Sequence, residues 1–534
     1  MSEGPVDTGA PSRSDWRPRH NPWAIAVTVT SAAFMEILDT TIVNVALPHI
    51  AGSLSVGPDE ATWALTSYLV ANGIVLPVSG WFGSVLGRKR YFMICIAMFT
   101  VCSLLCGLAT SLPQLILFRV AQGFFGGGLQ PNQQSIILDT FPPAKRGAAF
   151  SVTAIATIVA PVLGPTLGGI ITDNISWRWI FFINVPVGII AWLAVMALVE
   201  DPPWAKAAAR NGRLDIDYIG LSLIALGLGS LEIVLDRGEQ DDWLGSPFIR
   251  TFAVMAILGI VGAVCWLLVA KKPVVNIRVL ANRNFALGAT MIFSMAVVLY
   301  SSAVLIPQLA QQQLGYTATW AGMVLSPGAL LTIFTIPVVG RLLPLIQTRH
   351  LIAVGFVILG FALFYAASIT PQVNFGTLAF MRMFQTFGLA FLFVPISTIA
   401  FSTIKPELNR DAASLYTMFR NIAGSVGISV ATSLVTEHSQ THMAYMAQHL
   451  SPFDQPYLDT LARNTAALEA RGVAATSLAR TADGLVYKGL LLQSSVQAYL
   501  DVFVICAVLA FLIVPLTFLF APSKAGGRRP AGAD

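Results

Sequence analysis

Two acidic residues lie three positions apart within one long apolar stretch of the chain. Glu36 and Asp39 belong to the segment 23–46, and on a helix their side chains share one face. Neighbouring carboxylates in an apolar environment repel each other when both are ionised, and burial also favours the neutral form. The pair is therefore expected to take up and release a proton as a coupled unit. This is the chemistry of a proton carrier.

Four further ionisable residues are expected inside apolar segments, namely Arg119, Glu232, Arg382 and Arg420. Such groups are costly in a membrane and usually mark functional positions. Arg119 is a candidate partner of Asp39, so a permanent ion pair is the alternative to proton carriage there. The expected lining of a substrate cavity is Glu232, Arg382, Gln385, Arg420 and Asn421, although Glu232 lies close enough to the end of its segment to be a vestibule residue.

The composition excludes an ordinary soluble protein. Of 534 residues, 55% are hydrophobic and 11% are charged, against about 25% charged in soluble domains. The basic residues do not cluster on one polar domain, which argues against nucleic-acid binding. No histidine falls inside an expected span and the five cysteines lie in apolar runs, so no metal site, cofactor or enzymatic centre is predicted.

Apolar segments long enough to cross a membrane recur along the whole chain. Most of the 32 Lys and Arg residues fall in alternate loops and in both tails, which places both termini in the cytosol by the positive-inside rule. Fourteen spans are predicted, at 23–46, 61–83, 91–110, 113–138, 148–171, 179–199, 217–235, 251–270, 285–306, 319–339, 350–369, 376–403, 412–436 and 498–520.

The fifth predicted span contains helix-weakening residues at spacings of three and four. This pattern persists as a helix in lipid and lets a neighbouring helix approach closely. We expect the span to bend and to slide against a partner. The residues concerned are Pro161, Gly164, Pro165, Gly168 and the adjacent Gly169.

The polar loop 437–497 is unusually long for the outer side of the membrane. Residues 457–471 within it place Leu458, Leu461, Thr465 and Leu468 on one face, which predicts a small amphipathic helix outside the membrane. A lid over an outer vestibule and a docking surface for a periplasmic partner are both compatible with this helix.

Several motifs together resemble the 14-span drug:proton antiporters of the major facilitator superfamily. They lie in the expected order and at the expected depths, and they read Leu38-Asp-Thr-Thr-Ile-Val-Asn-Val-Ala-Leu-Pro48 with Asn44 in the seventh place, Gly80-Trp-Phe-Gly-Ser-Val-Leu-Gly-Arg-Lys-Arg90, Phe118-Arg-Val-Ala-Gln-Gly123 and Gly164-Pro-Thr-Leu-Gly-Gly169. Further stretches resemble the EmrB-like inner-membrane subunits of tripartite multidrug pumps, including Trp177-Arg-Trp-Ile-Phe-Phe-Ile-Asn-Val-Pro186 and Phe419-Arg-Asn-Ile-Ala-Gly424.

The resemblance implies an all-α fold of two six-helix bundles with two inserted helices. Its segments would be a disordered cytosolic tail 1–22, an N-terminal bundle 23–199, a linker with two extra spans 200–283, a C-terminal bundle 284–521 that includes the loop 437–497, and a tail 522–534. The resemblance also implies that Asp39 is the proton-coupling acid, that Arg119 senses its charge, and that the motif of the fifth span contacts the opposite bundle.

The inner-loop motif departs from the family at Ser84, where an acidic residue is usual. In that family the acid is thought to latch the two bundles together, and serine carries no charge. The motif positions Gly80, Ser84, Gly87, Arg88 and Lys89 are therefore expected at a conformational contact whose latch is weakened.

The expected activity is proton-driven efflux of hydrophobic or amphipathic small molecules across a bacterial inner membrane by alternating access. A periplasmic adaptor and an outer-membrane channel are the implied partners, besides substrates, protons and membrane lipid. The alternative is dedicated export of one endogenous metabolite, such as a siderophore, a fatty acid or an antibiotic.

Overall fold

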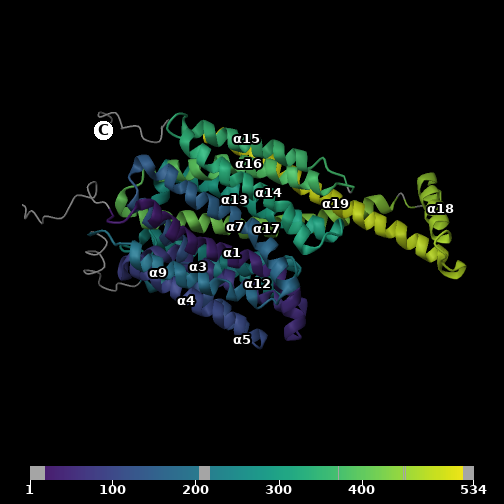
Figure 1. Ribbon diagram of the computed structural model, residues 1–534, viewed down its shortest axis with the longest axis horizontal. Coiled ribbons are helices and arrows are strands. Elements are labelled where there is room, and N and C mark those ends of the chain that lie inside the picture. The colour runs from purple at the N-terminus through teal and green to yellow at the C-terminus, as the bar shows by residue number, and fades with distance from the viewer. Residues whose placement is uncertain (1–17, 204–216, 371, 449, 451–452, 521–534) are drawn as a thin grey trace, which may run out of the picture.

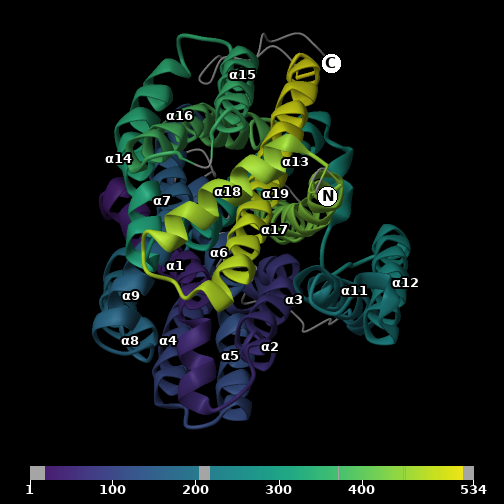
Figure 2. The same ribbon diagram turned by 90° about the vertical axis from the view of Figure 1, so that its right-hand side faces the viewer.

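The computed structural model describes residues 18–203, 217–370, 372–448, 450 and 453–520, and this part of the chain forms helices and connecting turns (Figure 1). Two helical bundles lie side by side along the long axis, and a third, smaller unit lies against them (Figure 2). The tails and the basic loop around Arg210 and Arg213, which we expected in the cytosol, lie mostly outside the described residues.

The N-terminal bundle is formed by the helices before residue 199. They are α1 (Pro22–Leu54), α2 (Pro58–Ala61), α3 (Trp63–Leu86), α4 (Arg88–Leu108), α5 (Leu112–Gly126), α6 (Leu129–Thr140), α7 (Arg146–Asn174), α8 (Trp179–Phe182) and α9 (Asn184–Leu198). Asn21 caps α1 by accepting a hydrogen bond from the Trp23 amide at 2.9 Å, and Pro22 follows at a position where its missing N–H costs nothing.

The two inserted helices are α11 (Tyr218–Arg237) and α12 (Pro247–Val269). They pack on each other, and α11 also contacts α3 of one bundle and α17 of the other. Figure 2 shows the pair beside the bundles, with α11 on the inner side. The side chains of Ile257 and Val269 on α12 are 63% and 79% exposed, as expected for a helix whose outer face meets lipid.

The C-terminal bundle repeats the plan with six long helices. They are α13 (Arg283–Gln308), α14 (Ala318–Leu342), α15 (Thr348–Ala366), α16 (Phe375–Ala400), α17 (Asn409–Ala447) and α19 (Ala475–Thr517), with α18 (Gln455–Glu469) between the last two. The bundles meet where α7 contacts α14 and α16, and where α17 contacts α3 and α6.

Thirteen helices in the described part of the chain are long and apolar enough to cross a membrane. The fourth predicted span, 113–138, is absent from that set because two consecutive helices, α5 and α6, replace it. They are separated by Gly127 and Gly128, both with helical backbone angles. A Cβ at Gly127 would lie 2.7 Å from the Asn72 carbonyl oxygen, so the break coincides with a very close approach to α3.

The last two long helices extend beyond the predicted spans 412–436 and 498–520. α17 continues to Ala447 and α19 begins at Ala475, so much of the predicted loop 437–497 consists of helical extensions. Figure 1 shows α17 and α19 projecting beyond the bundles and carrying α18 at their tip. We call this side of the molecule the α18 end. α18 confirms the predicted amphipathic helix, with Leu468 buried.

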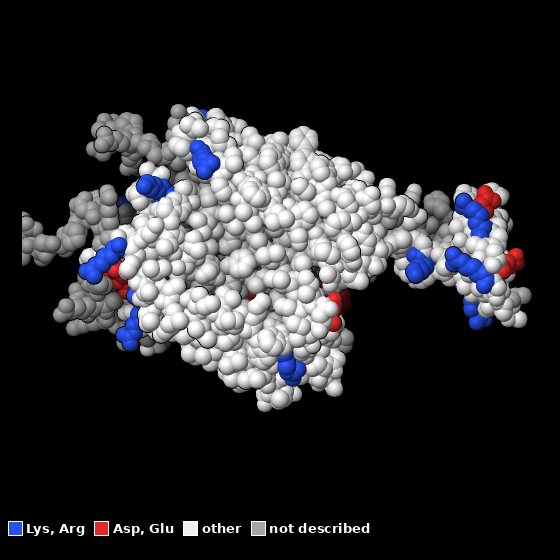
Figure 3. All heavy atoms as spheres, viewed as in Figure 1, with Lys and Arg blue, Asp and Glu red and all other residues white. Residues whose placement is uncertain are grey.

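The surface is divided into charged ends and an uncharged middle. On the face in Figure 3, Lys, Arg, Asp and Glu side chains gather toward the two ends of the long axis, and other residues cover most of the space between them. This distribution and the apolar helices identify a multi-pass membrane protein.

Candidate functional site: a cavity between the bundles

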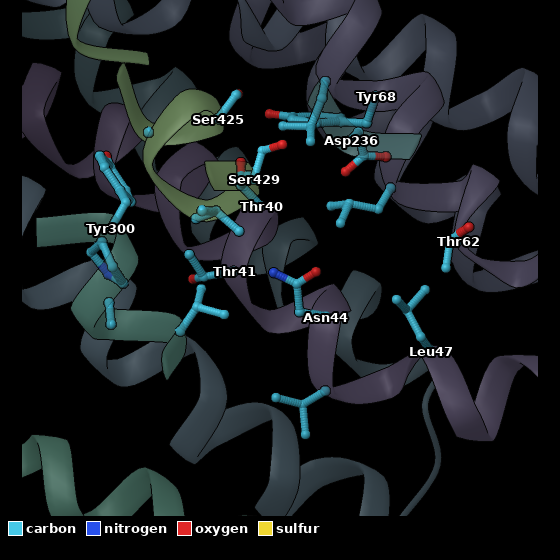
Figure 4. Close-up of a pocket in the computed structure, with 18 of the residues that line it drawn as sticks. Thr40, Thr41, Asn44, Leu47, Thr62, Tyr68, Asp236, Tyr300, Ser425 and Ser429 are labelled. Atoms are coloured by element: carbon cyan, nitrogen blue, oxygen red, sulfur yellow. The ribbon is translucent and has the colours of Figure 1, made fainter. Parts of the chain in front are cut away.

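A cavity of about 670 Å³ lies between the two bundles. Its wall combines apolar side chains with hydroxyl, amide and carboxyl groups. Figure 4 shows Thr41 and Asn44 from α1, Asp236 from α11, Tyr300 from α13 and Ser429 from α17 around the same space. Volumes of about 300–1,000 Å³ with a few polar groups are typical of small-molecule sites.

The cavity extends from the middle of the molecule toward the α18 end. Along α1 its wall begins at Glu36 and continues to His49, near the end of that helix. Asp173 at the end of α7 and Gln240 after α11 also line it. None of its lining residues belongs to α18 or to the extensions 437–497, so α18 does not act as a lid in this conformation.

At the opposite end the two bundles touch. The hydroxyl oxygens of Ser79 on α3 and Ser414 on α17 are 3.2 Å apart, and the rings of Phe150 on α7 and Phe401 are 5.8 Å apart between centroids. Thr417 also donates a hydrogen bond across the seam to Gln134, at 3.2 Å. The structure is therefore open toward the α18 end and closed at the other.

Asp39 and Arg119 form an ion pair in the interior of the N-terminal bundle. Both side chains are fully buried, and Arg119 Nη1 donates to Asp39 Oδ2 at 2.6 Å. The other carboxylate oxygen accepts from Gln122 at 3.1 Å and from Asn184 at 2.7 Å. Arg119 also stacks on the ring of Tyr68, with the guanidinium carbon 4.1 Å from its centroid. Three side chains thus donate to the two oxygens of the Asp39 carboxyl group.

Glu36, one helical turn away, has a different environment. Its Oε1 accepts from the Tyr68 hydroxyl at 3.1 Å and from Asn72 at 3.0 Å, and its Oε2 accepts from Gln130. Arg420 of the opposite bundle donates to the same Gln130 side chain. Glu36 is thus linked across the seam through a neutral amide rather than by direct contact with a cation.

The two carboxylates differ in their access to the cavity. Glu36 belongs to the cavity wall, whereas Asp39 does not. The sequence pattern predicts both on one face of α1, and Tyr68 connects their surroundings: its hydroxyl donates to Glu36, and its ring lies against Arg119, the partner of Asp39. The structure adds that only Glu36 borders the open space.

The inserted helix α11 supplies two further acids to the cavity wall, Glu232 and Asp236. Glu232 is buried and Asp236 is half-buried, and Glu232 Oε2 has no hydrogen-bond partner among the described residues. Thr66 donates to Asp236. Glu232 thus borders the cavity, and the insertion contributes to the cavity wall.

Arg382 and Gln385 do not line the cavity, contrary to the expectation from sequence. They lie three positions apart on α16, as Arg119 and Gln122 do on α5, the equivalent helix of the first bundle. Arg382 Nη1 donates to Ser302 at 2.7 Å and to Gln385 at 3.3 Å, so it faces its own bundle. Ser302 thus accepts from Arg382 in the C-terminal bundle, as Asp39 accepts from Arg119 in the N-terminal bundle.

Of the two α17 residues expected in the cavity wall, Asn421 lines it and Arg420 does not. Arg420 lies immediately behind Gln130, which also lines the wall. Sequence reasoning did not identify the amides and the phenol that hold the charges, namely Tyr68, Asn72, Gln122, Gln130 and Asn184. In the sequence these five residues are recognisable only as polar residues inside apolar segments, and this does not show which groups their side chains contact.

The small residues of α7 pack on two different helices. A Cβ at Gly168 would lie 3.0 Å from the Ile42 carbonyl oxygen, and Gly164 faces Thr41, so these glycines contact α1 of the same bundle. Pro161 and Pro165 line the cavity. The opposite bundle touches α7 at Thr166, where a Cβ at Gly322 of α14 would lie 2.7 Å from the Thr166 Cα.

Gly164→Ala is expected to destabilise the α1–α7 contact. The added methyl would collide with the Thr41 hydroxyl and lie 2.8 Å from its Cβ, and overpacking of this kind costs about 1–3 kcal/mol. The measurement is the thermal unfolding midpoint of the purified protein in detergent. Gly489→Ala in α19 is the matched control, because nothing lies within 4 Å of a Cβ there. Equal midpoints for the two variants would contradict the close packing.

The inner-loop motif lies at the closed end. Ser84 donates to the Trp81 carbonyl within its own helix, at 2.7 Å, and Gly80 lies against Ser414 and Arg410 of the opposite bundle. Gly87 has a φ of 85°, which favours glycine. Arg88 pairs with Asp139 of α6, and the Lys89 amide donates to Asp201 at 2.9 Å, both within the N-terminal half.

Comparisons with known proteins agree with one another. The family model of the Major Facilitator Superfamily matches residues 29–428. The multidrug export protein EmrB of Escherichia coli (strain K12) is 38% identical over 432 residues, which cover 80% of this chain and 83% of that protein. The fatty acid resistance protein FarB of Neisseria gonorrhoeae is 34% identical over 503 residues, covering 93% and 96%.

Solved structures show the same fold at much lower sequence identity. The crystal structure of the human organic anion transporter MFSD10 (TETRAN) superposes with a TM-score of 0.57 at 12% identity, covering 93% of this chain and 100% of that one.

Proposed function

Because this chain belongs to the major facilitator superfamily, we propose that it exports hydrophobic or amphipathic small molecules in exchange for protons. Membership makes it a membrane transporter and not an enzyme. The single observation that carries the export proposal is the cavity of about 670 Å³, with apolar walls and a few acidic and amide groups, between two bundles that close at only one end. Loose, largely apolar contacts of this kind permit broad substrate choice.

The relatives support the substrate class. EmrB of E. coli is named for multidrug export and FarB of N. gonorrhoeae for fatty acid resistance. Drugs of that kind and fatty acids share an apolar body with a polar end. Glu232 and Asp236 would bind cationic ends, the Asn421 amide would bind uncharged or carboxylate ends, and residues such as Leu47, Leu69 and Ile428 would contact apolar bodies.

Proton coupling is assigned to the two carboxylates of α1. Asp39 would be the acid whose charge Arg119 senses, and Glu36, the member that borders the cavity, would exchange protons with water there. Protonation of Glu36 would also weaken its hydrogen bond from Gln130, and Gln130 is the group that Arg420 of the other bundle holds. The protonation state of Glu36 on α1 would thereby affect the Gln130–Arg420 contact between the two bundles.

The energy available from one proton is sufficient. A membrane potential of about 150 mV is worth about 3.5 kcal/mol per charge. At about 1.4 kcal/mol per decade, this supports a gradient of a neutral solute of a few hundredfold. Alternating access would follow from rocking of the bundles about the seam.

The orientation proposed is that of a bacterial inner-membrane protein with cytosolic termini, so that the α18 end faces the periplasm. The basic residues around Arg88 and Lys89, at the end opposite α18, support this orientation. α18 and the helical extensions beneath it would offer a surface to a periplasmic adaptor, which in turn would connect to an outer-membrane channel.

The direct test is transport by the purified protein in liposomes that contain a fluorescent pH probe. Under an imposed proton gradient, addition of a hydrophobic drug is expected to trigger proton movement across the membrane, and liposomes without protein are not expected to respond. Movement of drug without protons would contradict antiport. Activation by long-chain fatty acids alone, among chemically unrelated substrates, would favour the dedicated exporter that the likeness to FarB suggests.

A further inference from the structure

Three metal-ligating side chains converge at the root of the projection that carries α18. His438 and His442 lie four residues apart on α17, so both face the same neighbour, α19. His438 Nδ1 and His442 Nε2 lie 2.9 Å and 2.6 Å from the same oxygen of Asp501 on α19. The three ligand atoms all lie within 4.8 Å of one another. No step of the proposed transport cycle uses this cluster.

We propose that His438, His442 and Asp501 form a binding site for a divalent transition metal, with Zn²⁺ as the preferred ion. Two imidazole nitrogens and one carboxylate oxygen are a ligand set that suits Zn²⁺, Co²⁺ and Ni²⁺, whereas Mg²⁺ and Ca²⁺ prefer oxygen alone. Three protein ligands leave one tetrahedral position for water.

The two nitrogen-to-oxygen separations need only a small expansion to hold the ion, and the two ring nitrogens already lie within 4.8 Å of each other. Ligand bonds of about 2.0–2.1 Å place the corners of a tetrahedron roughly 3.3 Å apart. The observed separations of 2.9 Å and 2.6 Å would therefore open by about half an ångström when the ion binds. The side chains are 33%, 28% and 29% exposed, which leaves a path for an ion from water.

The position indicates what the ion would do. α17 and α19 run side by side toward α18 (Figure 1), and a hydrogen bond between Ser439 and Ser495, at 3.2 Å, already links them beside the cluster. A metal bound to both helices would clamp them together where they leave the bundle. It would thereby fix the direction of the projection without touching the cavity, none of whose lining residues belongs to the cluster.

The test is metal binding by the full-length protein, purified without an oligohistidine tag and stripped with a chelator. Equilibrium dialysis against Zn²⁺ is expected to give one bound ion per chain. His438→Gln, His442→Gln and Asp501→Asn are each expected to weaken binding by about tenfold or more, since loss of even an outer partner of a metal site costs about 10–100-fold. Zn²⁺ should raise the unfolding midpoint of the wild type but not of these variants.

His49→Gln is the matched control, because His49 lies at the same end of the molecule, pairs with Asp173 at 3.9 Å, and belongs to no group of metal-ligating side chains among the described residues. This variant should bind Zn²⁺ as the wild type does. Co²⁺ absorption gives an independent measurement, in which a sulfur-to-cobalt band would assign the ion to a cysteine such as the exposed Cys265 and overturn the proposal. Undiminished binding in all three site variants would overturn it equally. Metal-free variants with wild-type midpoints establish that folding is intact.

Discussion

Asp39→Asn is expected to reduce drug-triggered proton flux to the level of empty liposomes. The amide cannot release a proton, and it cannot satisfy all the groups around it, because Arg119, Gln122 and Asn184 all donate to the two carboxylate oxygens. The NH2 group of the new asparagine would replace one carboxylate oxygen, so it would face a donor of Arg119, Gln122 or Asn184 without an acceptor between them. Removing one partner of a buried ion pair also costs about 3–5 kcal/mol, so the unfolding midpoint should fall as well.

A double variant separates the loss of transport from the loss of stability. Asp39→Asn combined with Arg119→Gln removes both charges, and neutral replacements of a buried ion pair are often close to neutral in stability. We expect the unfolding midpoint to recover toward the wild type while proton flux stays absent. Recovery of flux in the double variant, or normal flux in Asp39→Asn alone, would show that another acid carries the proton.

Glu36→Gln is expected to lower drug-triggered proton flux by at least about tenfold, since a positioned proton-transfer group typically contributes about 10²–10⁴-fold to a rate. Substrate exchange under equal pH on both sides should be affected less, because it requires no net proton movement. The carboxylate accepts from Tyr68, Asn72 and Gln130, and an amide in its place would lose at least one of these bonds.

Glu232→Gln is the comparison for this effect, because Glu232 is also a buried acid of the cavity wall but belongs to the inserted helix. It should weaken transport of cationic drugs more than that of neutral ones, and should leave the dependence on the proton gradient in place. A variant at Glu232 that loses coupling, beside a Glu36→Gln protein that retains it, would assign the proton to α11 instead of α1.

The fold followed from a few physical regularities of the sequence. Apolar segments of membrane length predicted a helical membrane protein, and the resemblance of its motifs to the major facilitator superfamily implied two bundles. The family model and the structural likeness confirm that fold. The sequence offered the pairing of Asp39 with Arg119 only as the alternative to proton carriage, because Arg382 and Arg420 also lie inside apolar spans.

Other features depended on contacts between distant residues. Hydropathy predicted the end of a span at residue 436, yet α17 continues to Ala447, because a helix does not have to stop where lipid stops. The Arg382 prediction was wrong for a related reason: its helical position was right, but the direction of its side chain depends on Ser302, 80 residues away. His438 and Asp501 are 63 residues apart, and no local pattern brings them together.

The one-sided cavity has a pharmacological consequence. On the proposed orientation, its mouth faces the periplasm, so a blocker could arrive from outside and act without crossing the inner membrane. A rigid molecule that fills the space between Asn44 of α1 and Gln312 of the C-terminal bundle would prevent the two bundles from closing over the cavity. Its potency in intact cells would then depend on passage through the outer membrane alone, and the pump could not lower its concentration at the site of action.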